Sequence, residues 1–227
     1  STAQYAQRVI QMGELPSRVF ISGAPGIDNI TKMDIISRQE CEKMLDFRLS
    51  ETNILITYHP LTITNSASNG IDNLLSAMEL LSDAVFIITY PNADAGGRDI
   101  IEKLKLFSDA NPDRVLFIES LGYERYLKTL QHIDCVVGNS SSGLIEVPSF
   151  NIPTVNIGDR QKGRIRGSTV IDCDESVDSI VRSVRLALSD SFKAAWSEEV
   201  NPYGEGNAAQ IILEALRNID FTQVVRK

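Results

Sequence analysis

Short apolar runs that alternate with helix-like stretches are the sequence feature that most limits how this chain can fold. Each run is rich in Val and Ile, carries apolar residues on both faces, and ends at Gly, Pro or polar residues. This pattern is typical of buried parallel strands. It predicts strands over 17–23, 53–58, 84–90, 114–120, 134–138, 153–158 and 168–173.

Helical periodicity fills the intervals between these runs. For example, Ile71, Leu74 and Met78 fall on one face of a helix. The alternation predicts an α/β fold with a doubly wound, Rossmann-like parallel sheet and right-handed crossovers. Ligands of such sheets bind beyond the carboxyl ends of the strands, so the turns after the strands are the places to look for a site. The predicted helices cover 66–82, 97–109, 122–131, 141–150, 175–189 and 207–218.

Charge and cysteine content narrow the class of protein. A formal net charge of −8 and a pI near 4.9 argue against nucleic acid or an anionic membrane as the main partner. Three cysteines without short spacings predict neither a disulfide framework nor a zinc site, and we expect neither a metal nor a cofactor. With no signal peptide and no membrane-spanning run, the sequence predicts a cytoplasmic protein. Because the chain begins with Ser rather than Met, we expect a fragment or a trimmed protein.

The turn "GNSSSG" (138–143) follows a predicted strand and precedes a predicted helix. Such a turn offers free backbone amides and hydroxyls, which suit phosphate oxygens, and Ser140 and Ser141 are the residues placed to supply them. Glu146 lies one helical turn further on, where a carboxylate suits the two hydroxyls of a ribose better than a phosphate. The alternative interpretation is an ordinary serine N-cap with a capping-box glutamate.

Three other turns carry candidate residues. Arg160 lies in the basic loop "NIGDRQKGRIRG" (156–167) and could reach the same anion, although the loop could equally be a solvated surface. His59 ends the strand 53–58, and Pro60 keeps it extended in a position for phosphate contact or proton transfer. Asn92, in "PNADAGGR", could bind a base or a sugar, or could serve only as a turn residue.

These turns, in this order, resemble the hydrolysing UDP-N-acetylglucosamine 2-epimerases. The matching stretches are "TYHP" (57–60), "PNADAGG" (91–97), "GNSSSGLIEVPSFNIPTVNIGDRQKGR" (138–164) and "NPYGEGNAA" (201–209). The resemblance covers nearly the whole chain but only the carboxyl-terminal portion of the family. "PNADAGGR" looks closest to the branch that serves sialic-acid and related nonulosonic-acid synthesis.

The resemblance implies the nucleotide-binding half of a GT-B-like two-domain fold. Residues 1–30 would be an interdomain segment with the first strand, 31–200 the UDP-binding domain and 201–227 a crossover helix, with the catalytic amino-terminal domain absent. Ser140 and Ser141 would hold the diphosphate, and Glu146 would hold the ribose. By the same resemblance, Arg160, with Arg164 as its rival, would lie near the phosphates, Tyr126 near the uracil, His59 at the leaving group and Asn92 near the nucleotide.

The family's reaction eliminates UDP as a base removes the C2 proton, and water then adds to the glycal to give N-acetylmannosamine. The essential carboxylates lie in the family's first domain, so no general base is expected in this chain. The resemblance implies UDP-sugar and UDP as partners and a homodimer. Two alternatives are a GT-B-type glycosyltransferase and a non-catalytic nucleotide-sugar-binding module.

Overall fold

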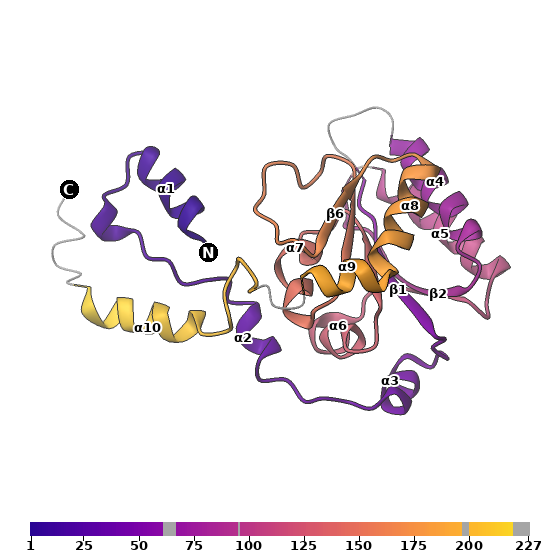
Figure 1. Ribbon diagram of the computed structural model, residues 1–227, viewed down its shortest axis with the longest axis horizontal. Helices are drawn as coiled ribbons and strands as arrows, with labels where there is room; N and C mark the ends of the chain where they lie inside the picture. The colour runs from indigo at the N-terminus through magenta and orange to yellow at the C-terminus, as the bar shows by residue number, and fades with distance from the viewer. Residues whose placement is uncertain (61–66, 95, 197–199, 220–227) are drawn as a thin grey trace. The chain divides into compact units, whose positions relative to one another are not determined.

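The structure is a computed structural model that describes residues 1–60, 67–94, 96–196 and 200–219 (Figure 1). The described residues fall into two compact units. One contains Ser1–Met33 with the described part of Val200–Lys227, and the other contains the described part of Asp34–Glu199. None of the helices in the described ranges is long and apolar enough to cross a membrane.

The larger unit is built on a six-stranded sheet in the order β3-β2-β1-β4-β5-β6, in which every neighbouring pair is parallel. This order is the doubly wound Rossmann arrangement, and it confirms the predicted fold class. The order reverses between β1 and β4, where the register pairs Thr57 with Gly138. The strands are β1 Thr52–Thr57, β2 Ala84–Thr89, β3 Val115–Ile118, β4 Cys135–Gly138, β5 Thr154–Ile157 and β6 Val170–Cys173.

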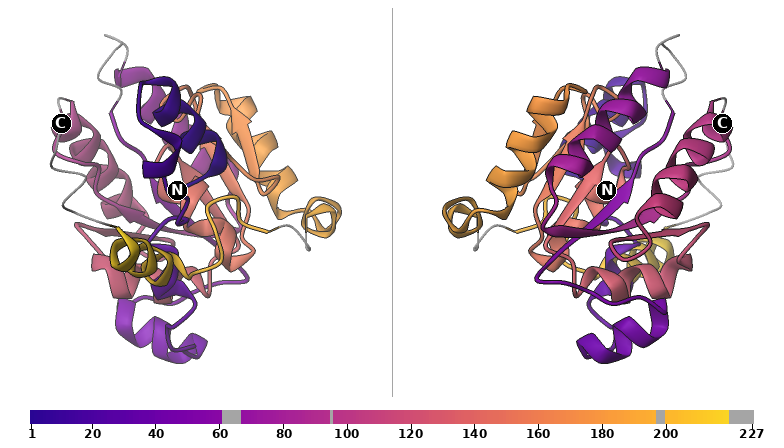
Figure 2. Two further views of the ribbon diagram at one scale, coloured as in Figure 1. Left: turned by 90° about the vertical axis from the view of Figure 1, so that its left-hand side faces the viewer. Right: turned by 90° about the vertical axis from the view of Figure 1, so that its right-hand side faces the viewer.

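Helices cover both faces of this sheet. Helix α4 (Ala67–Leu80) contacts both α5 (Gly97–Ala110) and α8 (Val177–Leu188), and the three run across one face in the order α8, α4, α5 (Figure 2). Helix α7 (Ser142–Ile145) packs on β4 and β5, and α6 (Gly122–Leu130) contacts α3 (Arg38–Leu45). Helix α9 (Asp190–Ala195) follows α8 and packs against it.

The main core lies between the sheet and the layer of α4, α5 and α8. Side chains alternate along β1, so Ile54 and Ile56 point into this core. Leu55, which points to the opposite face, is also fully buried. Burial on both faces explains why the strands read as continuous apolar runs.

The smaller unit joins segments far apart in sequence. It contains α1 (Ala3–Gln11), the 3-10 turn Pro16–Arg18, α2 (Ile27–Ile30) and α10 (Ala208–Asn218). The buried carboxylate of Asp28 accepts the N–H groups of Ala208 at 2.9 Å and Ala209 at 2.7 Å. Asp28 therefore caps α10, whose own N-cap residue Asn207 makes no side-chain capping bond.

The predicted strand 17–23 is wrong. Its first residues form the turn Pro16–Arg18, and the rest joins no strand of the described residues. Phe20 and Ile21 are about half exposed, at 51% and 50%. An apolar run becomes a strand only where a neighbouring strand can pair with it, and here it lies in the helical unit.

Candidate functional site

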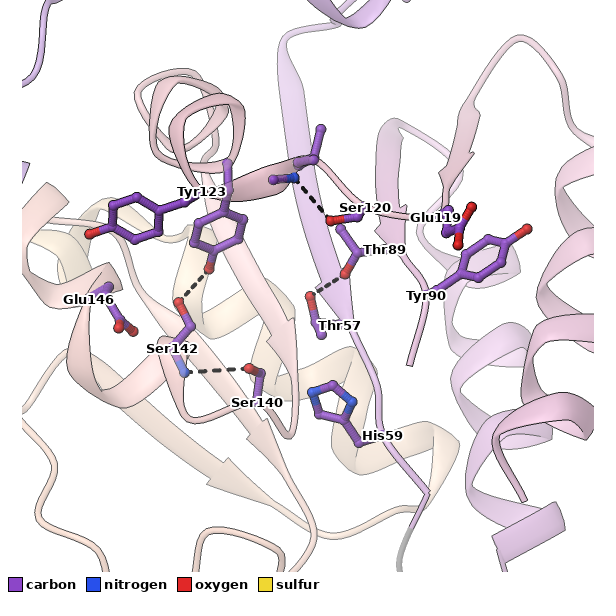
Figure 3. Close-up of a pocket in the computed structure, with 13 residues that line it drawn as sticks. Thr57, His59, Thr89, Tyr90, Glu119, Ser120, Tyr123, Ser140, Ser142 and Glu146 are labelled. Atoms are coloured by element: carbon purple, nitrogen blue, oxygen red, sulfur yellow. Dashed lines mark hydrogen bonds between the residues drawn. The ribbon is translucent and has the colours of Figure 1, made fainter. Parts of the chain in front are cut away.

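A cavity of about 450 Å³ lies beyond the carboxyl ends of β1, β2, β3 and β4 (Figure 3). This is the crevice where the strand order reverses, as expected for ligands of doubly wound sheets. Its volume falls in the usual range of small-molecule sites. Its lining residues are Thr57, His59, Thr89, Tyr90, Glu119, Ser120, Leu121, Gly122, Tyr123, Tyr126, Ser140, Ser142 and Glu146.

The turn after β4 is shaped by two glycines. Gly138 has a φ of +139°, and a Cβ there would lie 2.1 Å from the carbonyl oxygen of Thr57, so only glycine lets β4 turn so close to β1. A Cβ on Gly143 would lie 2.6 Å from Cγ2 of Thr154. The packing of α7 on β5 therefore explains why a glycine stands at position 143, without any contact to a ligand.

The turn between these glycines has unused hydrogen-bonding groups. Within the described ranges, the backbone N–H groups of Ser140 and Ser141 have no acceptor, and the Ser141 hydroxyl has no partner. Ser140 Oγ accepts only a long bond from the Ser142 N–H, at 3.4 Å. Free amides and hydroxyls at one turn can bind the oxygens of an anion.

The capping-box alternative for this turn is wrong. Ser141 is the N-cap of α7 but makes no side-chain capping bond. The predicted helix 141–150 is split into the four-residue α7 and the 3-10 segment Val147–Phe150, because Pro148 cannot continue the α-helical bonding. A helix of this length adds little dipole, so anion binding here would depend on the turn's own N–H and O–H groups.

Glu146 lies on the cavity wall beside two hydroxyls. Tyr126, on α6, and Ser142, on α7, share a hydrogen bond of 2.6 Å. Burial raises the pKa of the Glu146 carboxyl, while the neighbouring Ser142 acts in the opposite direction. Burial also raises the pKa of Tyr126, so its hydroxyl keeps its proton at neutral pH.

His59 is held from two sides. The side chain of Asn139 accepts the His59 N–H at 2.7 Å and donates to the His59 carbonyl at 2.9 Å. The Asn92 N–H donates to His59 Nδ1 at 3.0 Å. Burial, followed by the charge of Arg160, lowers the pKa of His59, although Asp94 and the side chain of Asn92 act in the opposite direction. His59 is therefore neutral at pH 7, with Nδ1 as an acceptor and its proton on Nε2.

Asn139 also connects this histidine to the basic loop. It is 1% exposed, and its carbonyl accepts Nη1 of Arg160 at 3.1 Å and Nε2 of Gln161 at 2.7 Å. The same residue therefore clamps the His59 backbone and holds the Arg160 guanidinium beside the serine turn. Arg164 is exposed, and no side-chain partner is found for it in the described part of the chain.

The cavity brings together four of the predicted site residues: His59, Tyr126, Ser140 and Glu146. The other three lie next to it without lining it. Ser141 belongs to the same turn, Arg160 is bonded to the carbonyl of Asn139, and Asn92 is bonded to His59. The Oδ1 atom of Asn92 is buried without a partner among the described residues.

Sequence reasoning missed the lining residues that follow β3. Glu119, Ser120 and Tyr123 come directly after this strand or in the first turn of α6. The rule that carboxyl ends of neighbouring strands meet would have pointed to them, because 114–120 was a predicted strand. Thr57 and Thr89 were also missed, because each lies within a predicted apolar strand, where a threonine does not suggest a binding site. Their hydroxyls share a hydrogen bond of 2.7 Å.

The sequence of this chain is similar to curated proteins over nearly its whole length. A profile described as UDP-N-acetylglucosamine 2-epimerase matches residues 1–217. Polysialic acid biosynthesis protein P7 of Escherichia coli is 38% identical over 100% of this chain and 57% of its own length. GDP/UDP-N,N′-diacetylbacillosamine 2-epimerase (hydrolyzing) of Campylobacter jejuni is 34% identical, over 98% of this chain and 58% of its own length. The chain thus spans less than two thirds of each relative.

Solved structures show the same fold. UDP-GlcNAc 2-epimerase from Neisseria meningitidis, bound to UDP-GlcNAc, superposes with a TM-score of 0.71 at 20% identity, over 96% of this chain and 60% of that chain. A structure from Listeria monocytogenes gives 0.71 at 19% identity, over 98% and 59%. At this identity the likeness concerns the fold alone, and it supports the α/β, Rossmann-like arrangement of the sheet.

Proposed function

Because this chain belongs to the UDP-N-acetylglucosamine 2-epimerase family, we propose that its cavity binds the UDP part of a UDP-sugar. One observation carries the proposal: the free amides of the serine turn, the Glu146 carboxylate and the Tyr126 ring border a single cavity at the reversal of strand order. A nucleoside diphosphate needs this combination of an anion cradle, a diol acceptor and an apolar surface.

The diphosphate lies at the serine turn in this proposal. Ser140 and Ser141 supply N–H and O–H donors, and the Arg160 guanidinium supplies charge from the neighbouring loop. Arg160 uses one nitrogen on the Asn139 carbonyl, and among the described residues the other donors of its guanidinium have no partner. Asn92 is proposed near the nucleotide, because its backbone supports His59 and its Oδ1 has no partner among the described residues.

The nucleoside lies between Glu146 and α6. The Glu146 carboxylate accepts the ribose hydroxyls, and the ring of Tyr126 contacts the uracil. Both residues line the cavity and are already half-buried. Contact with a ligand therefore removes little further water from either side chain. The Tyr126 hydroxyl bonds Ser142, which leaves the ring as the part of Tyr126 that meets the base.

His59 assists departure of UDP as a neutral donor. Its Nδ1 atom accepts the Asn92 N–H, so only Nε2 can carry the proton of the neutral ring. An Nε2–H group on the cavity wall can donate to a phosphate oxygen as negative charge develops there. In this role His59 is a catalytic residue that stabilises the leaving group, and no proton needs to leave its ring.

The reaction we propose for the intact enzyme is hydrolysis of UDP-N-acetylglucosamine to N-acetylmannosamine and UDP. A base removes the C2 proton as UDP leaves, and water adds to the resulting glycal. We assign the base to no residue of this chain, so these 227 residues alone bind nucleotide without turnover. A diacetamido-trideoxy sugar is the other candidate substrate, because a relative at 34% identity is named for N,N′-diacetylbacillosamine.

From the family resemblance we also propose that the protein is cytoplasmic and homodimeric and has its place in the synthesis of sialic acid or related sugars. A panel of UDP-sugars, with UDP and free sugar both quantified, identifies the substrate of the full-length enzyme. A requirement for an acceptor before UDP appears would identify a glycosyltransferase instead.

Titration calorimetry with UDP tests the binding site. Ser141→Ala and Glu146→Ala should each weaken binding by about 1–3 kcal/mol, since each loses hydrogen bonds to a charged or buried group. Glu79→Ala, which removes an exposed carboxylate from α4, is the matched control and should leave the affinity unchanged. Equal affinity in wild type and both site variants would remove the serine turn and Glu146 from the proposal.

A further inference from the structure

Gln161 is a fully buried side chain in the basic loop 156–167, and it does not line the cavity. We propose that Gln161 is a positioning residue: its amide fixes the basic loop against the turn after β4, so that the Arg160 guanidinium is in place before a diphosphate binds. The inference rests on the proposed function and deepens it. It makes diphosphate affinity depend on a neutral residue outside the cavity wall.

The amide of Gln161 is bonded to the same carbonyl that holds Arg160. Gln161 Nε2 donates to the carbonyl oxygen of Asn139 at 2.7 Å, and Arg160 Nη1 donates to this oxygen at 3.1 Å. A backbone carbonyl oxygen has two lone pairs, and these two donors occupy both. The two loop residues are therefore held together at the residue that directly precedes Ser140.

A glutamine at this buried position has a cost. Its side chain is 1% exposed, and its Oε1 atom is buried without a partner among the described residues. A buried acceptor without a hydrogen bond is unfavourable, so an apolar residue of similar volume would fill this space with less desolvation. The contact that an apolar residue could not make is the Nε2 bond to Asn139. That bond is therefore the physical reason for an amide at this position.

Two of the other basic side chains of the loop are paired with carboxylates. Arg166 forms an ion pair with Asp172 of β6, which fastens the far end of the loop to the sheet. Lys162 is paired with Asp159 at 3.3 Å, and both are exposed. A paired charge attracts an anion less than a free one. Diphosphate affinity should therefore depend on where Arg160 lies more than on the total charge of the loop.

The position of Arg160 matters because a long side chain loses conformational entropy when a ligand orders it. The bond to Asn139 removes part of this freedom before the ligand arrives. The shorter bond from Gln161 keeps the loop and this carbonyl together. Without the amide, the longer bond of Arg160 would have to hold the loop alone, and binding of a diphosphate would have to order both.

Titration calorimetry with UDP on the 227-residue chain tests the inference through a neutral substitution. Gln161→Met keeps the volume of the side chain and removes the amide. It should weaken UDP binding by about fivefold, the usual net contribution of one hydrogen bond. Lys162→Met is the matched control at the next position, because it removes a positive charge from the exposed side of the loop. It should change the affinity by less than about twofold.

A double-mutant cycle separates positioning of Arg160 from a general loosening of the site. Arg160→Ala should weaken UDP binding by about tenfold or more, as expected for hydrogen bonds to a charged group. Adding Gln161→Met to it should cost less than about a further twofold, because the effect of Gln161 passes through Arg160. The affinity for uridine, which has no phosphate, should be equal in wild type and all four variants by NMR titration. Circular dichroism and thermal unfolding confirm that each variant is folded.

Each contrary outcome has one meaning. Equal UDP affinity in wild type and Gln161→Met overturns the positioning role and leaves UDP binding at the cavity intact. A full fivefold loss on adding Gln161→Met to Arg160→Ala also overturns it, because the two residues would then act independently. A weaker affinity for uridine in Gln161→Met overturns it by showing that the whole site is disturbed. A wild type that does not bind UDP rejects the proposed function and the inference together.

Discussion

The charge of His59 is decided by neighbours that the local sequence does not reveal. The Asn92 N–H donates to Nδ1, and burial with the nearby Arg160 disfavours a proton on that atom. Since the pKa in the folded state lies below that in the unfolded state, protonation favours unfolding. The stability that the neutral ring contributes is complete above pH 6.5 and is lost as pH falls towards the lowered pKa.

Proton–carbon NMR of the imidazole groups tests this charge state. The chain contains 2 histidines, so a His59→Asn variant assigns the His59 signals by their loss. We expect the His59 titration midpoint below 6.5, its ordinary value, and a higher midpoint when UDP is added, because the diphosphate favours a positive ring. A midpoint at or above 6.5 without ligand would contradict the role of His59 as a neutral donor.

At the scale of elements, hydrogen bonds join the turn after β4 to His59, which follows β1. Asn139 makes two side-chain bonds to the His59 backbone, while its carbonyl holds Arg160 and Gln161. Sequence reasoning singled out Ser140 and Ser141 but passed over Asn139, since a turn asparagine is unremarkable in sequence. Its importance comes from partners 80 and about 20 residues away.

An Asn139→Asp substitution measures this coupling, because it keeps the shape and the acceptor but replaces the donor that faces the His59 carbonyl. We expect a loss of about 1–3 kcal/mol at neutral pH, the cost of an unmet bond and a buried charge. The loss should shrink as the pH falls, since the protonated carboxyl can donate again. Urea unfolding at pH 7.5 and 5 measures both values, and an equal loss at the two pH values would contradict the account.

Among the elements, the strands of the sheet were the most predictable from sequence. The six sheet strands were predicted to within a few residues, because burial on both faces leaves an apolar run that few other structures explain. The strand 17–23 failed because pairing depends on a neighbour, which no local pattern records. Four helices of the described residues were missed: Ala3–Gln11, Ile27–Ile30, Arg38–Leu45 and Asp190–Ala195. The third of these begins with a capping box of Ser37 and Glu40 that was readable in advance.

The sequence predicted which turns form the candidate site, but not the side-chain contacts between them. Topology brings the ends of β1 and β4 together, so the grouping of His59 with Ser140 and Glu146 follows from strand order. The bond between Tyr126 and Ser142 joins residues from different elements, and its 2.6 Å geometry depends on how α6 and α7 pack. The hydrophobic periodicity of the sequence does not predict side-chain packing of this kind.

At the scale of the whole molecule, an acidic chain is proposed to bind an anionic nucleotide. The net charge of −8 disfavours such a ligand at long range, so affinity must come from short-range donors at the serine turn and from Arg160. Those donors are half-buried at or beside the cavity, where hydrogen bonds to an anion are stronger than in water. Added salt should therefore weaken binding only modestly.

The last prediction concerns the 227-residue chain as a unit, in which UDP binding and turnover should separate. With UDP at about 100 times its Kd, binding should stabilise the unit of Asp34–Glu199 by about 2.7 kcal/mol and raise its melting temperature. The same sample should release no UDP from UDP-N-acetylglucosamine above the rate of a buffer blank. Scanning fluorimetry and a coupled UDP assay supply the two readings, with ADP as the nucleotide control. Turnover by this chain alone would place a general base within it and contradict the assignment of that base to another part of the enzyme.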